Sequence, residues 1–544
     1  MGYVCRYAEA LQRSRFEFVF IALMIKFGVV NKFKRRIVYG LLWAVCAGLI
    51  GVFLPHWPLA QSDVDLAPLE VHAIAADPGL AAAPRTEPPT QAGVVAFPSG
   101  AIENERVIHF TNRAAFQAYL DALAAAGAAP LGQIGALLVA RVGADAIAAV
   151  NPERYGGEEH FSFAVMHPPL PEVDAQWFAQ LQAFSQSARS IVGGQLQGTG
   201  TGVLVGILDS GINAHPQFDN VHTGHVDLVG AGIAGAGAAH GTAVASIVAG
   251  SEGVAPEAEL LIVRVLDEQG RGNSFHVAQG IVQAVDLGAQ VLNFSLGVYQ
   301  DTQILREAVA YAHARGVVMV AAAGNDGYTQ MPYPAAYSQV LAVTAVDGRG
   351  QHALFPNQSA EIDFAAPGVG VLAAQGDQGS VSFSGTSAAA PFVTGTLASM
   401  LSSGAVQTGP QAVDLIKRYL DDAGAPGVDP AYGEGLVNWD RLRERDTAAL
   451  HDLALADVYL SPAALPGTTV PVQVTVQNRG TSWLSAATLR VLLGEAESFD
   501  FTLETLGPGR ITTRTVHTQL PPQTANQSLS IAAQVVPESD VVDV

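Results

Sequence analysis

The chain has 544 residues, 49% of them hydrophobic, and a formal net charge of −21 at pH 7. This length exceeds what a single hydrophobic core usually serves, so we expect two or three folded units. The 49 acidic residues outnumber the 28 basic ones, which argues against nucleic acid as a partner. Both cysteines, Cys5 and Cys46, lie near the N-terminus. Thiol chemistry, disulfides and cysteine-ligated metals are therefore excluded from the rest of the chain.

Residues 1–60 are interpreted as an export leader. A basic cluster at 32–36 precedes an uncharged run from Ile37 to Leu54, and this order is typical of a signal sequence. The run is about as long as the shortest membrane-spanning helices. Cleavage of a signal peptide and a retained membrane anchor at residues 37–54 therefore both remain open. In either case we expect an exported protein, in a bacterial periplasm or outside the cell.

The composition and the hydrophobic pattern change several times along the remainder of the chain. Residues 61–100 are rich in Pro and Ala and are interpreted as a linker. Residues 101–170 predict a small α/β unit, with a strand at 106–110 and a helix that Thr111 would cap. Residues 185–446 predict a larger α/β domain, and strict alternation after His451 predicts an all-β sandwich over residues 451–544.

The larger α/β domain is predicted to contain a parallel sheet. Apolar strands alternate there with helical stretches, and this alternation is typical of a sheet with helices on both faces. Functional groups of such sheets gather at the carboxyl ends of the strands. The predicted strands are Val203–Leu208, Leu260–Val265, Val291–Phe294, Val317–Ala322 and Val340–Ala345.

Three polar residues interrupt this region at positions where chemistry is expected. Asp209 ends the first strand, His240 opens a helix, and Ser387 precedes an Ala-rich helix. Singly, Asp209 and Ser387 could be a turn former and a helix cap. In the order Asp, His, Ser, the three supply a carboxylate to orient an imidazole, an imidazole to take a proton and a hydroxyl to attack a carbonyl. We therefore expect acyl transfer.

The segments around these residues resemble the subtilisin-like serine protease family over residues 185–446. The aspartate, histidine and serine each lie in a segment typical of the family, and an asparagine segment lies between the last two. These segments are 207-ILDSGI-212, 240-HGTAVA-245, 293-NFSLG-297, 321-AAAGN-325 and 385-GTSAAAP-391. The resemblance implies an endopeptidase in which Asp209 orients His240, His240 is the general base, Ser387 is the nucleophile and Asn325 binds the oxyanion.

The resemblance also implies where a protein or peptide substrate binds. An extended peptide would pair with Ser295, Leu296 and Gly297, and its P1 side chain would enter a pocket beside Ala322, Ala323 and Gly324. These small residues favour an apolar P1 side chain. Two nearby residues leave alternatives open, because Asp326 could attract a basic group and Pro332 could shorten the pocket.

The resemblance further implies that catalysis needs no cofactor. A structural calcium site is common in the family, but the loop that usually holds it is missing, since residues 249–252 lead directly into 253–256. Weaker oxygen-ligand sites stay open. Residues 101–170 occupy the place of the family's inhibitory propeptide, so we expect a zymogen inhibited by its own propeptide. We also expect the protein to be a monomer. The C-terminal region resembles CARDB-like adhesion modules. Its role stays open between a passive stalk or stabilising cap and a module that binds substrates or surfaces.

Two other functions fit parts of the sequence. Gly230, Gly232 and Gly235 form a G-x-G-x-x-G pattern, with Glu252 about 20 residues later, as in dinucleotide-binding oxidoreductases. A catalytically silent envelope protein on a protease scaffold is the second alternative. His240 follows these glycines, and a histidine at this position favours the protease interpretation over both alternatives. The glycines would then let the chain turn tightly and pack closely just before His240.

Overall fold

A computed structural model of the protein describes residues 71–73, 100–168, 190–461, 463–485, 487–494, 497–521 and 529–537. All of them belong to one compact unit, Pro68–Val544. The predicted leader lies outside the described residues, as does almost all of the predicted linker. Within the described ranges no helix is both long and apolar enough to cross a membrane.

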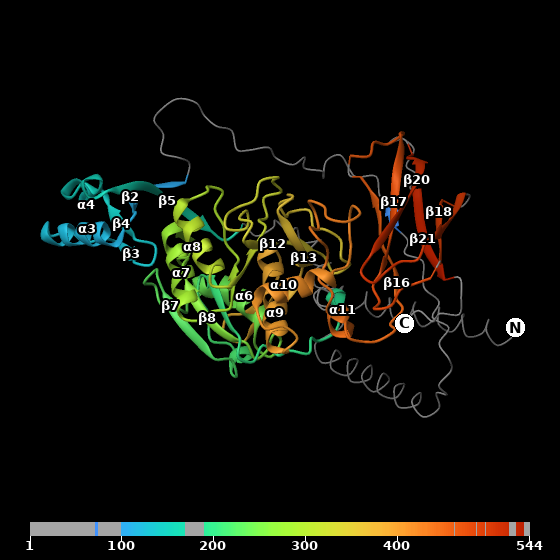
Figure 1. The fold of residues 1–544 in the computed structure, drawn as a ribbon, viewed down its shortest axis with the longest axis horizontal. Coiled ribbons are helices and arrows are strands. Elements are labelled where there is room, and N and C mark those ends of the chain that lie inside the picture. The colour runs from blue at the N-terminus through green and yellow to red at the C-terminus, as the bar shows by residue number, and fades with distance from the viewer. Residues whose placement is uncertain are drawn as a thin grey trace, which may run out of the picture. The chain divides into compact units, whose positions relative to one another are not determined.

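Residues 100–168 form an antiparallel sheet covered by helices (Figure 1). Phe116, Tyr119 and Leu123 lie on one face of helix α3 and pack into a cluster with buried residues of the sheet. The cap of α3 is Asn112, whose side chain accepts a hydrogen bond from the Ala115 N–H at 2.9 Å. The prediction of Thr111 as the cap is therefore wrong by one residue. The elements are β2 (Ala101–Phe110), α3 (Arg113–Ala125), β3 (Gly132–Ile134), β4 (Val139–Gly143), α4 (Ala144–Ala149), η1 (Pro152–Tyr155) and β5 (Gly157–Met166).

The predicted parallel sheet is confirmed. Seven strands follow the spatial order β13-β12-β11-β10-β6-β8-β7, and every neighbouring pair is parallel. Because all seven run the same way, their carboxyl ends meet at one edge of the sheet. The strands are β6 (Leu204–Asp209), β7 (Thr223–Asp227), β8 (Glu259–Arg264), β10 (Val291–Phe294), β11 (Val318–Ala322), β12 (Val340–Val346) and β13 (Ile362–Pro367).

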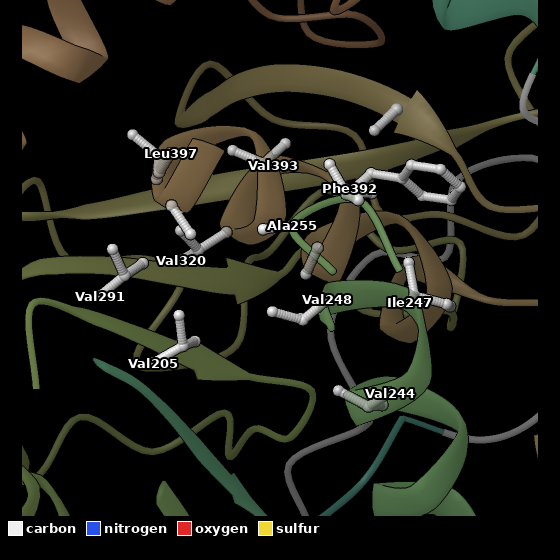
Figure 2. Close-up of a cluster of buried hydrophobic side chains, with 14 of the residues drawn as sticks. Val205, Val244, Ile247, Val248, Ala255, Val291, Val320, Phe392, Val393 and Leu397 are labelled. Atoms are coloured by element: carbon white, nitrogen blue, oxygen red, sulfur yellow. The ribbon is translucent and has the colours of Figure 1, made fainter. Parts of the chain in front are cut away.

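Helices cover both faces of this sheet, as predicted (Figure 1). Successive strand residues point to opposite faces, so Val291 packs in one cluster and Leu292 in the other. Figure 2 shows the first cluster, in which Val205 and Val320 of the sheet face Val393 of helix α9. Helices α6 (Ala239–Val248) and α9 (Thr386–Ser402) cover that face, and α7 (Ser274–Asp286) and α8 (Gln303–His313) cover the other.

Short elements connect the main ones. The hairpin of β14 and β15 packs beside α6, and strand β9 pairs with β5 of the N-terminal sheet. The remaining elements of this region are η2 (Ser190–Val192), η3 (Pro216–Phe218), η4 (Ala236–Ala238), β9 (Arg271–Asn273), β14 (Val371–Gln375), β15 (Gly379–Phe383), α10 (Gly409–Arg418) and α11 (Trp439–Glu444).

The C-terminal region consists of two sheets that share one core, as the sandwich prediction requires. Val472, Val474 and Val476 alternate along β17 and are fully buried in this core. The sheets have the orders β16-β17-β20 and β1-β21-β18-β19, so residues 71–73 supply one edge strand. The strands are β1 (Val71–Ala73), β16 (Leu453–Leu460), β17 (Thr469–Asn478), β18 (Ala487–Leu493), β19 (Glu497–Leu503), β20 (Ile511–Gln519) and β21 (Leu529–Pro537).

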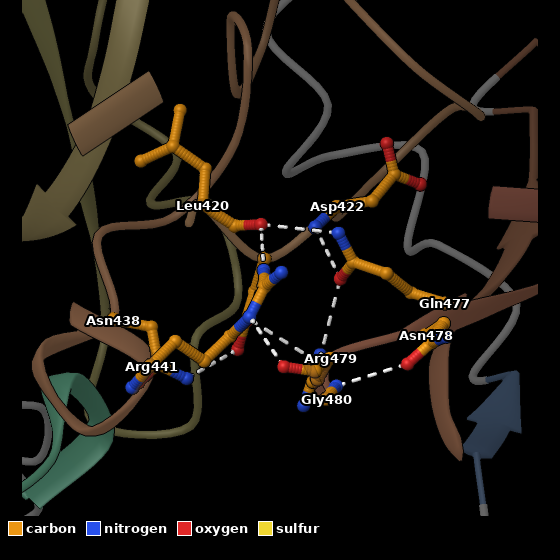
Figure 3. Close-up of polar contacts among 9 residues, drawn as sticks. Leu420, Asp422, Asn438, Arg441, Gln477, Asn478, Arg479 and Gly480 are labelled. Atoms are coloured by element: carbon orange, nitrogen blue, oxygen red, sulfur yellow. Dashed lines mark hydrogen bonds and ion pairs between the residues drawn. The ribbon is translucent and has the colours of Figure 1, made fainter. Parts of the chain in front are cut away.

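Buried polar contacts join this sandwich to the α/β domain (Figure 3). The Arg441 guanidinium donates to the carbonyls of Leu420 and Arg479 and pairs with Asp421 at 3.2 Å. Gln477 of β17 donates to the Leu420 carbonyl at 3.1 Å. A buried charge of this kind is tolerated only when it is paired and fully hydrogen-bonded. The sandwich is therefore held by specific contacts as well as by the connecting chain.

Three carboxylates lie beside this contact. Asp422 and Asp429 are each only 6% exposed, and one oxygen of each has no hydrogen-bond partner among the described residues. Burial raises the pKa of Asp422 to about 6, and the charges of Asp429 and Asp457 add to the effect. The pKa values of Asp429 and Asp457 are raised as well, chiefly by burial. All three carboxyl groups therefore keep their protons to a higher pH than an exposed aspartate does.

We expect Asp422→Asn to stabilise the protein at alkaline pH. The pKa of Asp422 is higher in the folded protein than in the unfolded chain, so its contribution to stability is present at about pH 4 and is lost as the pH rises through 6. The variant should therefore unfold at a higher temperature than its parent at pH 8, with little difference at pH 4. Thermal unfolding followed by circular dichroism, in a Ser387→Ala background that prevents self-digestion, measures this. Asp414→Asn, at an exposed position, is the control. An equal effect at both pH values would contradict the expectation.

Candidate active site

Asp209 lies at the carboxyl end of β6, at the centre of the site. Its side chain is fully buried, and Oδ1 accepts a hydrogen bond from the Ser210 N–H at 2.7 Å. The two carboxylate oxygens lie 2.9 and 3.0 Å from His240 Nδ1. A buried carboxylate needs such donors because ionisation without them is costly. The structure therefore brings the predicted Asp209 and His240 together.

His240 is the second residue of α6, and its approach to Asp209 depends on glycines. A Cβ atom at Gly241 would lie 2.2 Å from the Gly211 carbonyl oxygen and 3.1 Å from Asp209 Oδ1. Because Asp209 can only accept, His240 Nδ1 carries the proton in this pair, and Nε2 is left as an acceptor. Nε2 is buried and has no partner among the described residues.

Ser387 lies in the first turn of α9, behind Gly385, whose φ of 137° suits glycine. Helices α6 and α9 pack against each other, so the serine and the histidine come from neighbouring elements. Ser387 Oγ is buried and, like His240 Nε2, makes no hydrogen bond among the described residues. The expected bond between these two atoms is therefore not formed. Catalytic hydrogen bonds are often long or misaligned until a substrate is bound.

Asn325 follows β11 and is held by Thr386. Its Oδ1 accepts from the Thr386 N–H at 2.9 Å and from Thr386 Oγ1 at 2.8 Å. This arrangement turns Nδ2 toward Gly385, where an added Cβ would lie 2.9 Å from it. The amide group is thus aimed at the backbone next to Ser387. Sequence reasoning missed the positioning role of Thr386, although this residue lies inside the quoted GTS segment.

A proline inside α9 links Ser387 to the predicted substrate strand. Pro391 has no N–H, so the Ser387 carbonyl four residues earlier receives no helical hydrogen bond from it. Ser295 Oγ donates to that carbonyl instead, at 3.1 Å. Ser295 directly follows β10, and the adjacent Leu296 is buried. The predicted substrate strand therefore lies beside the serine.

An extended segment of the chain itself already lies against this strand. Met166 and Gly297 exchange two backbone hydrogen bonds, of 2.9 and 3.3 Å. On its other side the same segment pairs with β9, where Val165 lies opposite Gly272. The N-terminal α/β unit thus extends one strand into the place predicted for substrate.

The residues predicted to form the P1 pocket are small and buried, and a polar cluster lies next to them. Ala322, Ala323 and Gly324 are all buried. Next to them Tyr299 donates to Asp326 Oδ2 at 2.5 Å. Burial first, and then the bond to Asp326, raise the pKa of Tyr299 well above its usual value, so the phenol remains a donor. Asn357, which sequence reasoning did not single out, donates to Tyr299 Oη and to the Ala323 carbonyl, each at 3.0 Å.

The glycine run holds a carboxylate of the protein itself. Asp227 accepts hydrogen bonds from the N–H groups of Val229, Gly230 and Gly232 at 2.7 to 3.0 Å. Burial opposes ionisation of Asp227, but these bonds outweigh it and hold the pKa of its carboxyl below the usual range. Arg264, 1% exposed, donates to the Gly232 carbonyl. The amides that would cradle a pyrophosphate are thus occupied, so the structure gives no support to the dinucleotide alternative.

Within the described part of the chain, no group of three or more His, Cys, Asp or Glu side chains is placed to hold a metal ion. At the predicted site of the missing calcium loop, the Gly253 N–H donates to the Gly250 carbonyl at 2.8 Å, forming a tight turn.

Comparisons with known proteins extend these observations. A model of the subtilase family matches residues 200–435, and a model of the CARDB family matches residues 450–544. Over 246 residues the chain is 38% identical to subtilisin BL from Lederbergia lenta, covering 44% of this chain and 90% of that protein. The chain belongs to the subtilase family. It is also 38% identical to a thermostable alkaline protease from Halalkalibacterium halodurans, over 44% of this chain and 68% of the relative. For the minor extracellular protease Epr from Bacillus subtilis the identity is 33%, over 44% and 38% of the two chains.

Membership of the subtilase family makes the protein a serine endopeptidase and confirms the family predicted from the sequence. The match to the CARDB model likewise confirms the predicted kinship of the C-terminal region. The family assignment removes the oxidoreductase alternative, in agreement with the occupied glycine loop. The roles of individual residues rest on the geometry above.

We expect Gly241→Ala to impair this subtilase severely. The added methyl would collide with the Gly211 carbonyl and displace His240 from Asp209. Misplacement of a catalytic group by about 1 Å can cost about 100-fold in rate, so kcat/KM on a peptide anilide should fall by roughly that factor. Gly232→Ala is the control. Its Cβ would meet nothing within 4 Å, and with a φ of +81° it should lower stability only. Unchanged kcat/KM in Gly241→Ala would contradict the expectation.

Proposed function

We propose that the protein is an exported serine endopeptidase that hydrolyses peptide bonds through Asp209, His240 and Ser387. The observation that carries this proposal is the pair of contacts between the buried Asp209 carboxylate and His240 Nδ1, at 2.9 and 3.0 Å. These contacts select the tautomer in which Nε2 can take a proton. Ser387 lies on the adjacent helix and is the nucleophile.

The reaction follows from these roles. Ser387 Oγ attacks the carbonyl carbon of the substrate, and its proton passes to His240 Nε2. Asp209 stabilises the imidazolium that forms. The imidazolium then protonates the departing amine, which leaves an acyl-enzyme. Water attacks the acyl group while His240 takes its proton, and His240 returns this proton to Ser387 Oγ as the carboxylic acid leaves.

Asn325 is proposed to stabilise the negative oxygen of the tetrahedral intermediate. Thr386 donates two hydrogen bonds to Asn325 Oδ1, of 2.8 and 2.9 Å, so Nδ2, the donor atom of this amide, is the atom proposed to bind the oxyanion. The Ser387 N–H, in the first turn of α9, is the second donor, since N–H groups there have no partner within the helix. Preorganised donors of this kind lose little energy to reorientation as charge develops.

The substrate is proposed to be a protein or peptide with an apolar P1 side chain. Ala322 and Ala323 are small and fully buried. The Asp326 carboxylate, the one group here that would attract a basic P1 side chain, already accepts the hydrogen bond from Tyr299. Ser295, Leu296 and Gly297 are proposed to pair with the substrate backbone.

The unit at residues 101–168 is proposed to be an inhibitory prodomain. Its strand β5 pairs with β9 and, through Met166, with Gly297. A peptide substrate paired with the same groups could not bind until this strand leaves. Export is proposed from the leader and from the kinship with a minor extracellular protease. For the sandwich we propose the role of a stabilising cap, because its contacts with Arg441 and Leu420 are buried.

Labelling with a fluorophosphonate tests the nucleophile. We expect the label at Ser387, slowly in the full chain and faster once the prodomain has been removed, with no label in Ser387→Ala. Tryptic peptide mapping by mass spectrometry identifies the labelled residue. If neither form is labelled, the protein is the catalytically silent alternative and the proposal is wrong.

Substitutions of the two supporting residues should separate their roles. We expect Asp209→Asn to lower kcat by about 10⁴, as in serine proteases where this exchange was made, because the amide favours the wrong tautomer. Asn325→Ala should lower kcat by about 10²–10³ with little change in KM; subtilisin itself supplies that magnitude. Both are measured on a peptide anilide, with Asp414→Asn as a surface control. A large rise in KM with kcat unchanged would assign Asn325 to substrate binding.

A further inference from the structure

Pro332 lies between the two segments that are proposed to form the P1 pocket. A Cβ atom added to Gly297, on one segment, would lie 2.8 Å from Pro332 Cβ and 3.2 Å from Pro332 Cγ. A Cβ atom added to Gly324, on the other segment, would lie 3.4 Å from Pro332 Cγ. The proline is itself buried. Its ring therefore packs against both segments and bridges them.

The backbone next to Pro332 is paired with the proposed substrate strand. Tyr333 and Val298 exchange two hydrogen bonds, in which the N–H to oxygen distances are 2.7 and 3.0 Å. Tyr333 directly follows Pro332, and Val298 directly follows Gly297, so this pairing keeps the proline against the strand. The pyrrolidine ring is closed onto its own backbone and cannot swing aside as an open side chain can. Pro332 is consequently a fixed part of the wall.

Asn357 holds the second segment and the loop that leads from it toward Pro332. Its side chain is fully buried, and Oδ1 accepts hydrogen bonds from the N–H groups of Asp326 and Tyr328 at 3.2 and 2.9 Å. Nδ2 donates to the carbonyl oxygens of Ala323 and Gln330 at 3.0 and 3.2 Å. One amide group thus bonds to both ends and to the middle of this loop.

Tyr299 connects the same amide to the proposed substrate strand. Asn357 Nδ2 also contacts Tyr299 Oη at 3.0 Å, and Tyr299 in turn donates to Asp326 Oδ2 at 2.5 Å. Tyr299 lies two residues after Gly297 on the same segment. If the two segments moved apart to admit a larger group, buried polar atoms would lose their partners, which costs more than a typical hydrogen bond contributes. The width between the segments is therefore fixed from both sides.

We propose that Pro332 is the specificity-determining residue of the P1 pocket and limits it to side chains of about the size of alanine. The proposal rests on the proposed function and narrows its substrate class, from apolar P1 side chains in general to small ones. Asn357 is a positioning residue in this proposal, since it touches no substrate and acts by fixing the loop beside Pro332.

Close packing explains why the limit falls on size. A P1 side chain between the two segments has to fit into what the Pro332 ring leaves free. A methyl group is short enough, whereas an isobutyl or benzyl group would overlap the ring or force the bonded segments apart. A difference of one methylene group changes the kcat/KM of an apolar pocket by about 10–200-fold. Leucine and phenylalanine differ from alanine by more than that.

Peptide anilides that differ only in their P1 residue test the proposal. The full chain, once activated, is assayed with tetrapeptide anilides that carry Ala, Leu or Phe at P1. We expect kcat/KM to be higher for Ala than for Phe by about 10-fold or more. In Pro332→Gly, the ratio of kcat/KM for Phe to that for Ala should rise by about 10-fold or more, chiefly through a gain on Phe. Pro332→Ala removes the Cγ atom that faces Gly324 and should shift the ratio in the same direction. Pro410→Ala, at an exposed proline in the first turn of α10, is the matched control and should leave the ratio unchanged.

Asn357→Ala tests the positioning role. A residue needed only for stability would lower kcat/KM by the same factor for all three substrates. If Asn357 fixes the width between the segments, the ratio of kcat/KM for Phe to that for Ala should rise in this variant as it does in Pro332→Gly. An unchanged ratio would overturn the role proposed for Asn357.

Two results would overturn the role proposed for Pro332. One is a higher kcat/KM for Phe than for Ala in the unmodified protein, and the other is an unchanged ratio in both Pro332 variants. Fluorophosphonate labelling of the same samples separates these failures from failure of the proposed function. A labelled Ser387 leaves the proposed function standing, whereas an unlabelled Ser387 with no hydrolysis of any anilide removes the proposed function and this inference with it.

Discussion

The burial of the Asp209 carboxylate is the constraint on which the rest of the site depends. A fully buried carboxylate is stable only with hydrogen-bond donors around it, and here Ser210 and His240 supply them. This requirement draws the start of α6 against the end of β6 and makes glycine necessary at Gly241. The imidazole is consequently fixed in orientation and tautomer. The position of α9 then decides what His240 can act on.

Helix α9 carries the second half of the site in the core of the domain. Its residues from Thr386 to Met400 are all buried, so the helix has little freedom to shift relative to the sheet. Two residues of this helix, Thr386 and Pro391, shape the site. Thr386 in the first turn orients Asn325, and Pro391 leaves the Ser387 carbonyl for Ser295. Ser387, the proposed oxyanion donor and the proposed substrate strand are therefore connected through one rigid element.

The two flanking units act on this domain in different ways. The proposed prodomain contributes a strand that pairs with Gly297, a residue that is also proposed to pair with the substrate backbone. The sandwich contacts the last part of the α/β domain through Arg479, which pairs with Asp421 at 3.2 Å and accepts a hydrogen bond from Arg441 at its carbonyl. Asp421 is buried and also pairs with Arg441, so loss of either arginine would leave a buried charge less well compensated.

The sequence by itself determined the family, the parallel sheet and the sandwich, because short motifs and hydrophobic periodicity are local properties of a chain. It also predicted Asp209, His240, Asn325 and Ser387 as the site residues, and the structure brings Asp209 and His240 into contact. Local signals left other points undecided. Thr111 and Asn112 are both good capping residues, and only the backbone chose Asn112. Gly230, Gly232 and Gly235 resembled a nucleotide loop, and only tertiary structure showed that Asp227 fills it. Thr386, Asn357 and Tyr299 bond across 27 to 62 residues of sequence, and Met166 pairs with Gly297 across two folded units. Such pairings depend on how elements pack, and no local pattern records them.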